Sequence, residues 1–272
     1  MAVSAIGTVS PRLRPSVFSN VAFVALNVLG VGAYIYPFLF SGVTRPGHDW
    51  FAHSADGPLI MAGVAVLCLV LVVSELTEGS LNSKSLAVLG VLAALAAVLR
   101  MVTLPAGASL YFFVVILGGY VFGMRMGFLL GVLSFLLSAL VTAGVGPWLP
   151  FQVFAAGWMG LSAGLLGNVL RGAPLRFELL AVAALGAAWG ILYGAIANLW
   201  SWPFFVAGPD IGYEPGLGLA ETVRRYWNFY LLTSFGWDLM RSITNVVVLL
   251  AVGLPLLKAL KRFHARFSWE RG

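Results

Sequence analysis

Long apolar runs separated by short polar segments dominate this chain of 272 residues. A helix needs about 20 residues to cross the hydrocarbon core of a bilayer, and eight of the runs approach or exceed that length. They cover residues 17–40, 58–76, 85–104, 108–123, 126–144, 151–170, 178–203 and 229–257. The runs do not alternate apolar with polar residues, which excludes a transmembrane β-barrel. The pattern predicts an all-α polytopic membrane protein with about eight transmembrane helices.

The composition supports this class. Hydrophobic residues make up 60% of the chain and charged residues 10%, and the mean hydropathy is +0.96. Soluble domains have a far larger charged fraction. The first apolar run follows two arginines, but it is longer than the roughly 7–15 apolar residues of a signal peptide. We therefore expect it to be a retained span.

Basic residues distribute unevenly between the two sets of loops. With a cytoplasmic N-terminus, eleven of them fall inside: Arg12, Arg14, Lys84, Arg125, Arg171, Arg176, Lys258, Lys261, Arg262, Arg266 and Arg271. Only Arg45, Arg224 and Arg225 fall outside. Cytoplasmic loops of membrane proteins are enriched in lysine and arginine. The sequence thus predicts a multi-pass plasma-membrane protein with both termini in the cytoplasm, and the net charge of +6 gives no reason to expect nucleic-acid binding.

The spacing of small residues distinguishes two parts of the chain. Small residues recur every fourth position in three places, which are Gly119 to Gly131, Ala156 to Asn168 and Gly186 to Gly194. Such spacing places them on one helix face, where it permits close helix packing in lipid. We predict a two-helix extension at residues 1–80, a six-helix core at 81–264 and a basic cytoplasmic tail at 265–272. The longest connection, at about 207–228, is a candidate lid.

Polar and aromatic side chains gather in the outer half of the predicted core. Charged groups within spans are costly and are usually paired or functional. We predict a substrate pocket open to the outside and built from Arg100, Trp148, Gln152, Asn198, Trp202, Trp237, Asp238 and Arg241. Plainer interpretations stay open. Asp238 and Arg241 are three residues apart and can neutralise each other, Arg100 can extend to the interface, and the tryptophans can form an interfacial belt.

The motifs of several enzyme classes are absent from the sequence. No GxxxxGK[ST] loop is present, so the chain itself does not bind ATP in the P-loop manner. His48, His53 and His264 all fall outside the predicted spans, which excludes an intramembrane Ser-His dyad or HExxH zinc site. The spacing of His48 and His53 is a poor fit to a metal site. We expect no catalytic residues, no metal and no catalytic cofactor.

The region from about Ser83 to Arg262 resembles the substrate-binding (S) component of energy-coupling-factor (ECF) vitamin transporters. The resemblance depends on its six spans, the small-residue helix LAVLGVLAALAAVLR and the segment GVGPWLPFQVFAAGWMGLSAGLLG. That segment is similar to the family pattern GPWTPxQxxAWGxxGxxAG. It departs from the pattern at Leu149, in place of threonine, and at Ala156, where tryptophan is preferred.

The resemblance implies a protein that captures a vitamin from outside and passes it to a transmembrane coupling subunit with two cytosolic ATPases, which hydrolyse the ATP. The docking face would lie on the first core helix, at Gly90, Ala93, Ala94 and Ala97. Cobalamin or a related corrinoid is the first candidate substrate, with queuosine-type precursors, biotin or another vitamin as alternatives. A membrane assembly protein and an independent secondary carrier are the competing functions.

Overall fold

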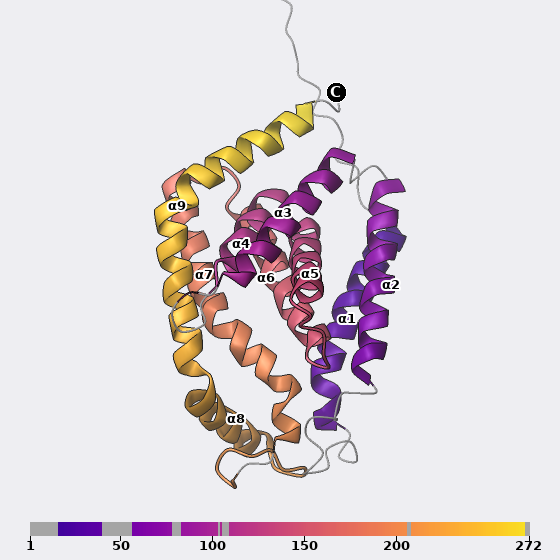
Figure 1. The fold of residues 1–272 in the computed structure, drawn as a ribbon, viewed down its shortest axis with the longest axis vertical. Helices are drawn as coiled ribbons and strands as arrows, with labels where there is room; N and C mark the ends of the chain where they lie inside the picture. The colour runs from indigo at the N-terminus through magenta and orange to yellow at the C-terminus, as the bar shows by residue number, and fades with distance from the viewer. Residues whose placement is uncertain are drawn as a thin grey trace, which may run out of the picture.

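A computed structural model describes residues 16–39, 56–77, 83–102, 104, 109–205 and 208–269. All its regular structure is helical in these residues (Figure 1). The helices are α1 (Val17–Leu39), α2 (Asp56–Thr77), α3 (Ser83–Met101), α4 (Tyr111–Phe122), α5 (Met124–Val141), α6 (Leu149–Val169), α7 (Leu175–Ala197), α8 (Leu219–Thr233) and α9 (Phe235–Trp269). Two short 3-10 turns, η2 (Asn198–Trp200) and η3 (Trp202–Phe204), follow α7.

Seven of these helices are long and apolar enough to cross a membrane, which confirms a polytopic all-α membrane protein. The predicted span at 108–123 is the short helix α4. Its 12 residues extend only about 18 Å at 1.5 Å per residue, so α4 does not cross a bilayer alone. The last span begins at Phe235 rather than at 229, because the separate helix α8 continues to Thr233.

Glycines in α4, α5 and α6 allow the backbones at the centre of the core to touch. A Cβ added at Gly160 would overlap the backbone of Gly127, and one added at Gly131 would overlap the backbone of Ala156. A Cβ at Gly119 would likewise meet the carbonyl of Gly160. The rows of small residues at every fourth position, which we call small-residue ladders, are therefore the faces along which these three helices pack.

The third row of small residues, Gly186 to Gly194, brings α7 against α9. A Cβ at Gly190 would overlap the backbone of Ser242, and a Cβ at Gly194 would overlap the carboxylate of Asp238. Polar side chains of α9 reach across this contact, since Ser242 Oγ donates to the Ala187 carbonyl at 2.9 Å and Asn245 Nδ2 to the Gly186 carbonyl at 2.9 Å. In lipid these bonds satisfy groups that have no water to bind.

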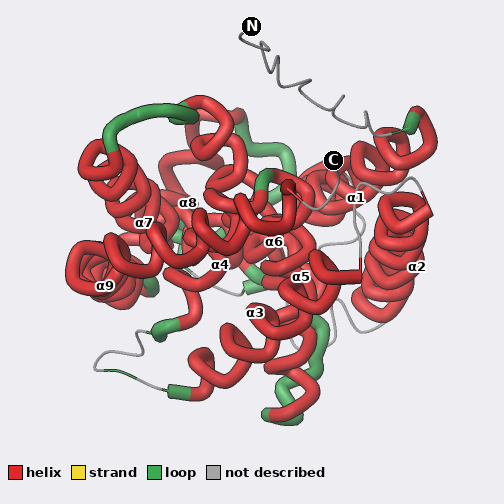
Figure 2. Tube along the Cα trace, turned by 90° about the horizontal axis from the view of Figure 1, so that it is seen from above, coloured by secondary structure: helices red, strands yellow, loops and turns green. Residues whose placement is uncertain are grey.

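Helices α1 and α2 form a hairpin beside the core, against α5 and α6 (Figures 1 and 2). Tyr34 donates from its hydroxyl to the Phe151 carbonyl at 2.7 Å, and Trp158 donates from Nε1 to Asn27 Oδ1 at 2.9 Å. At the other end of the hairpin the buried Glu75 forms an ion pair with Arg125. Helix α3 lies along a different side of the core (Figure 2), so the hairpin leaves α3 uncovered.

The ion pair between Glu75 and Arg125 should determine how firmly the hairpin is attached. Removing one partner of a buried pair leaves an uncompensated charge and typically costs about 3–5 kcal/mol. We expect Arg125→Met to lower the melting temperature of the purified protein. The double variant Glu75→Gln/Arg125→Met should recover part of the loss, because no buried charge remains. If both variants melt like the wild type, the pair does not stabilise the hairpin.

Candidate functional site: a cavity at the centre of the core

A cavity of about 340 Å³ lies where the six core helices converge. Each of these helices, or the residues directly next to it, contributes to the wall: Arg100 (α3), Ser109, Tyr111 and Phe112 (α4 and the residues before it), Phe135 (α5), Gln152 (α6), Tyr193 (α7) and Arg241 (α9). The N-terminal end of α4 is buried at Tyr111 and Phe112, and both residues line the cavity.

Arg100 enters the cavity from the last turn of α3. Its guanidinium carbon lies 3.9 Å from the centre of the Phe135 ring, and its Nη1 donates to Ser138 Oγ at 2.8 Å. No carboxylate in the described part of the chain forms an ion pair with it. The contacts orient the arginine without neutralising it, since a ring face and a hydroxyl carry no formal charge.

Arg241 enters from α9 on the other side. Its Nη1 forms an ion pair with Asp238, as the three-residue spacing allows, and donates to the Gly190 carbonyl at 3.2 Å. The guanidinium also lies 5.4 Å from the ring centres of Phe112 and Tyr193. Asp238 is 2% exposed and sits behind Arg241, in the space that the missing side chain of Gly194 leaves. The acid therefore positions the arginine and does not line the cavity.

The remaining predicted site residues lie away from the cavity wall. Trp202 is buried, and its ring centre lies 4.9 Å from that of Tyr226. Asn198 donates to Ser234 Oγ at 2.5 Å and so links the end of α7 to the junction of α8 and α9. Trp148 lies beside Trp200, with ring centres 6.5 Å apart. Trp237 is 58% exposed and is not among the residues that line the cavity.

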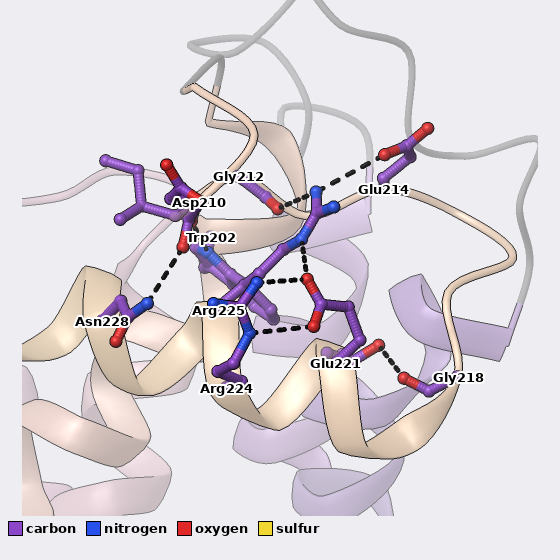
Figure 3. Close-up of polar contacts among 11 residues, drawn as sticks. Trp202, Asp210, Gly212, Glu214, Gly218, Glu221, Arg224, Arg225 and Asn228 are labelled. Atoms are coloured by element: carbon purple, nitrogen blue, oxygen red, sulfur yellow. Dashed lines mark hydrogen bonds and ion pairs between the residues drawn. The ribbon is translucent and has the colours of Figure 1, made fainter.

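Residues 208–233, which we call the α8 cap, fold across one end of the bundle (Figure 1). Glu221 makes several of its polar contacts (Figure 3): it accepts from Arg224 Nε and Nη2 at 2.9 and 2.7 Å and from Arg225 Nε at 2.8 Å. Trp202 Nε1 donates to the Ile211 carbonyl at 2.8 Å, and Asn228 Nδ2 donates to the Asp210 carbonyl at 3.3 Å. The predicted lid segment is thus an ordered helix and turn.

The pH dependence of the α8 cap follows from Glu221. Hydrogen bonds from Arg224 and Arg225 lower the pKa of this carboxyl from 4.5 to about 2. A lowered pKa means that the stabilisation is complete above pH 4.5 and is lost as the pH falls toward 2. We expect Glu221→Gln to lower the melting temperature by a constant, small amount from pH 8 to 5, and by less below that. Glu214→Gln is the control, because its single contact with Arg225 spans 3.4 Å. A difference that grows on acidification would contradict this account.

Sequence reasoning missed the aromatic half of the cavity wall. Tyr111, Phe112, Phe135 and Tyr193 stand within apolar runs, where an aromatic residue is ordinarily part of the core. Tyr193 directly precedes the last glycine of the α7 ladder, which was a usable signal that it lies near α9. Among the described residues no group of three or more His, Cys, Asp or Glu is arranged to hold a metal ion. His48 and His53 lie outside the described residues.

Seven apolar helices of spanning length mark a multi-pass membrane protein, and the partly open polar cavity among the core helices is its candidate binding site. A family model described as the substrate-specific component of ECF transporters matches residues 84–253, which is more than half of the chain and begins at the start of α3. The chain therefore belongs to the family of ECF transporter substrate-specific components, which are transport proteins. No curated protein and no solved structure matches it.

Proposed function

We propose that this protein captures a small organic molecule from the extracytoplasmic side in the central cavity, and delivers it to an ATP-driven coupling module. The observation that carries the proposal is that all six core helices line the cavity and that every described residue of its wall lies inside the family match. Polar groups placed at such depth in a membrane protein are expensive and are usually functional. The α8 cap would face the outside, as the distribution of basic residues predicts.

The α3 face supports the second half of this proposal. Gly90 and Ala94 are exposed, whereas Ala93 and Ala97 are packed against the core. A Cβ added at Gly90 meets nothing within 4 Å. Two of the four predicted docking residues thus form an open, small-residue surface that a helix of the coupling subunit can approach closely. The buried pair, Ala93 and Ala97, sets the distance between α3 and the rest of the core.

The size of the cavity bears on the substrate. At about 340 Å³ it lies near the lower end of the roughly 300–1,000 Å³ typical of small-molecule sites. That volume suits a substrate with one or two rings or a short chain. A corrinoid macrocycle is larger than this space, so its binding would need the core helices to move apart. The cavity volume therefore favours the smaller candidate substrates over cobalamin. Binding measurements with both kinds of ligand test this preference.

The competing functions differ in what they require of the cavity. An assembly protein has no use for two arginines placed in a central space. A secondary carrier typically has inverted repeats and helices broken near the bilayer midplane. The membership of residues 84–253 in the S-component family favours the ECF function over both.

Co-expression with an ECF transmembrane subunit and its two ATPases tests the function. We expect the four proteins to purify together, and vesicles containing them to accumulate substrate only when ATP is supplied. The small molecules retained by the purified protein, identified by mass spectrometry, give candidate substrates. Accumulation by this chain alone, driven by an ion gradient, would instead indicate a secondary carrier. Absence of both co-purification and retained ligand would contradict the proposal.

A further inference from the structure

The two arginines of the cavity indicate the chemistry of its ligand. Arg100 and Arg241 both line this partly open cavity, and no acidic residue in the described part of the chain lines it with them. Asp238 forms an ion pair with Arg241, whereas Arg100 contacts Ser138 and Phe135. Two positive charges and one negative charge leave one positive charge uncompensated. An uncompensated charge among apolar helices is costly, so an anion that enters the cavity would be favoured.

The geometry points to a substrate that carries a carboxylate bound between Arg100 and Arg241; this inference rests on the proposed function and specifies the class of substrate. A guanidinium presents parallel N–H donors that match the two oxygens of a carboxylate. Among the described residues, Arg100 and Arg241 each use only Nη1 in their hydrogen bonds and ion pairs. The other donors of both side chains are available to a ligand.

The aromatic and amide side chains of the cavity wall indicate which other groups the substrate carries. The rings of Tyr111, Phe112, Phe135 and Tyr193 form a continuous aromatic surface, since the ring centres of Phe112 and Tyr193 lie 5.1 Å apart and those of Phe135 and Tyr193 lie 6.5 Å apart. Gln152 lines the cavity, and its side-chain amide makes no hydrogen bond with the described residues. These lining residues suit a small carboxylic acid that has an apolar body and one group able to form a hydrogen bond with the Gln152 side-chain amide.

Matched pairs of acids and neutral analogues test the inference with the purified full chain. The probes are nicotinate with nicotinamide, pantothenate with panthenol, and biotin with biotinamide, together with cyanocobalamin, which has no free carboxylate. We expect the melting temperature to rise with at least one acid and not with its neutral partner. Arg100→Gln and Arg241→Gln should each weaken binding of that acid at least tenfold, and Arg100→Lys should weaken it less. Arg176→Gln, an exposed arginine on α7 outside the cavity, should leave binding unchanged.

The melting temperature of a ligand-free variant also tests the inference, and it does so even when no acid of this panel binds. Gln152→Glu adds a carboxylate beside the two arginines, so it should raise the melting temperature of the ligand-free protein. A lower melting temperature for Gln152→Glu, or a retained ligand without an acidic group, would overturn the inference. Co-purification with the coupling subunit is measured on the same samples. If a neutral ligand binds and coupling persists, only the substrate class is wrong; if coupling and ligand retention are both absent, the proposed function fails.

Discussion

Replacing Gly160 by valine will leave little folded protein in the membrane. Gly160 lies where α5 and α6 meet, and even a Cβ there would overlap the carbonyl carbon and oxygen of Gly127. Both obstacles are backbone atoms, so no side chain can rotate away and the helices must separate. Overpacking of a core typically costs about 1–3 kcal/mol. A forced separation of two backbones should exceed that range, because it also disturbs the contact of α4 with Gly160.

The matched control for Gly160→Val is Gly32→Val. Gly32 is also a helical glycine, but it lies on the exposed side of α1, and a Cβ there meets nothing within 4 Å. The measurement is the yield of monodisperse protein after detergent extraction, followed by its melting temperature. We expect near-complete loss for Gly160→Val and wild-type behaviour for Gly32→Val. Equal yields from the two variants would show that the close approach of α5 and α6 does not hold the core together.

The pattern of small residues predicted this contact because helix geometry fixes it locally. Residues four apart share a face whatever surrounds the helix, so the ladders at Gly119–Gly131 and Gly186–Gly194 were readable before the fold was known. The same argument failed for α4. A helix that spans the membrane and a short helix packed within a bundle can have the same apolar composition. Which of the two forms depends on tertiary contacts, and hydrophobic periodicity does not report those contacts.

Depth along a helix placed part of the candidate site. Arg100, Gln152 and Arg241 were expected in the outer half of the core, and all three line one cavity. Depth does not give direction around the helix axis, however. Trp237 precedes Asp238 by a single residue, which is a rotation of about 100°, and its side chain is 58% exposed while that of Asp238 is buried. Residues of equal depth can therefore face the cavity or the lipid, and only the packing of α9 against α7 distinguishes them.

Placing leucine at Gly90 and Ala94 together should abolish coupled transport while leaving substrate binding intact. Both positions are on the exposed face of α3, which the α1–α2 hairpin leaves uncovered. Two leucines there would stand out from a surface that a partner helix must approach closely in the absence of a hydrophobic driving force. We expect co-purification with the coupling subunit to fall at least roughly tenfold, which corresponds to about 1.4 kcal/mol of docking free energy.

Binding of substrate by the isolated double variant should stay within about twofold of the wild type, a difference below roughly 0.5 kcal/mol. The reason is that Arg100, the nearest cavity residue on α3, keeps its contacts with Phe135 and Ser138. Gly32→Leu is the control for a bulky residue on an exposed helix face that is not the proposed docking surface, and it should preserve both binding and co-purification. A double variant that still purifies with the coupling subunit would mean that docking uses another face. Loss of binding along with docking would mean that the packing of α3 extends its influence into the cavity, since Ala93 and Ala97 on the same helix are buried against the core.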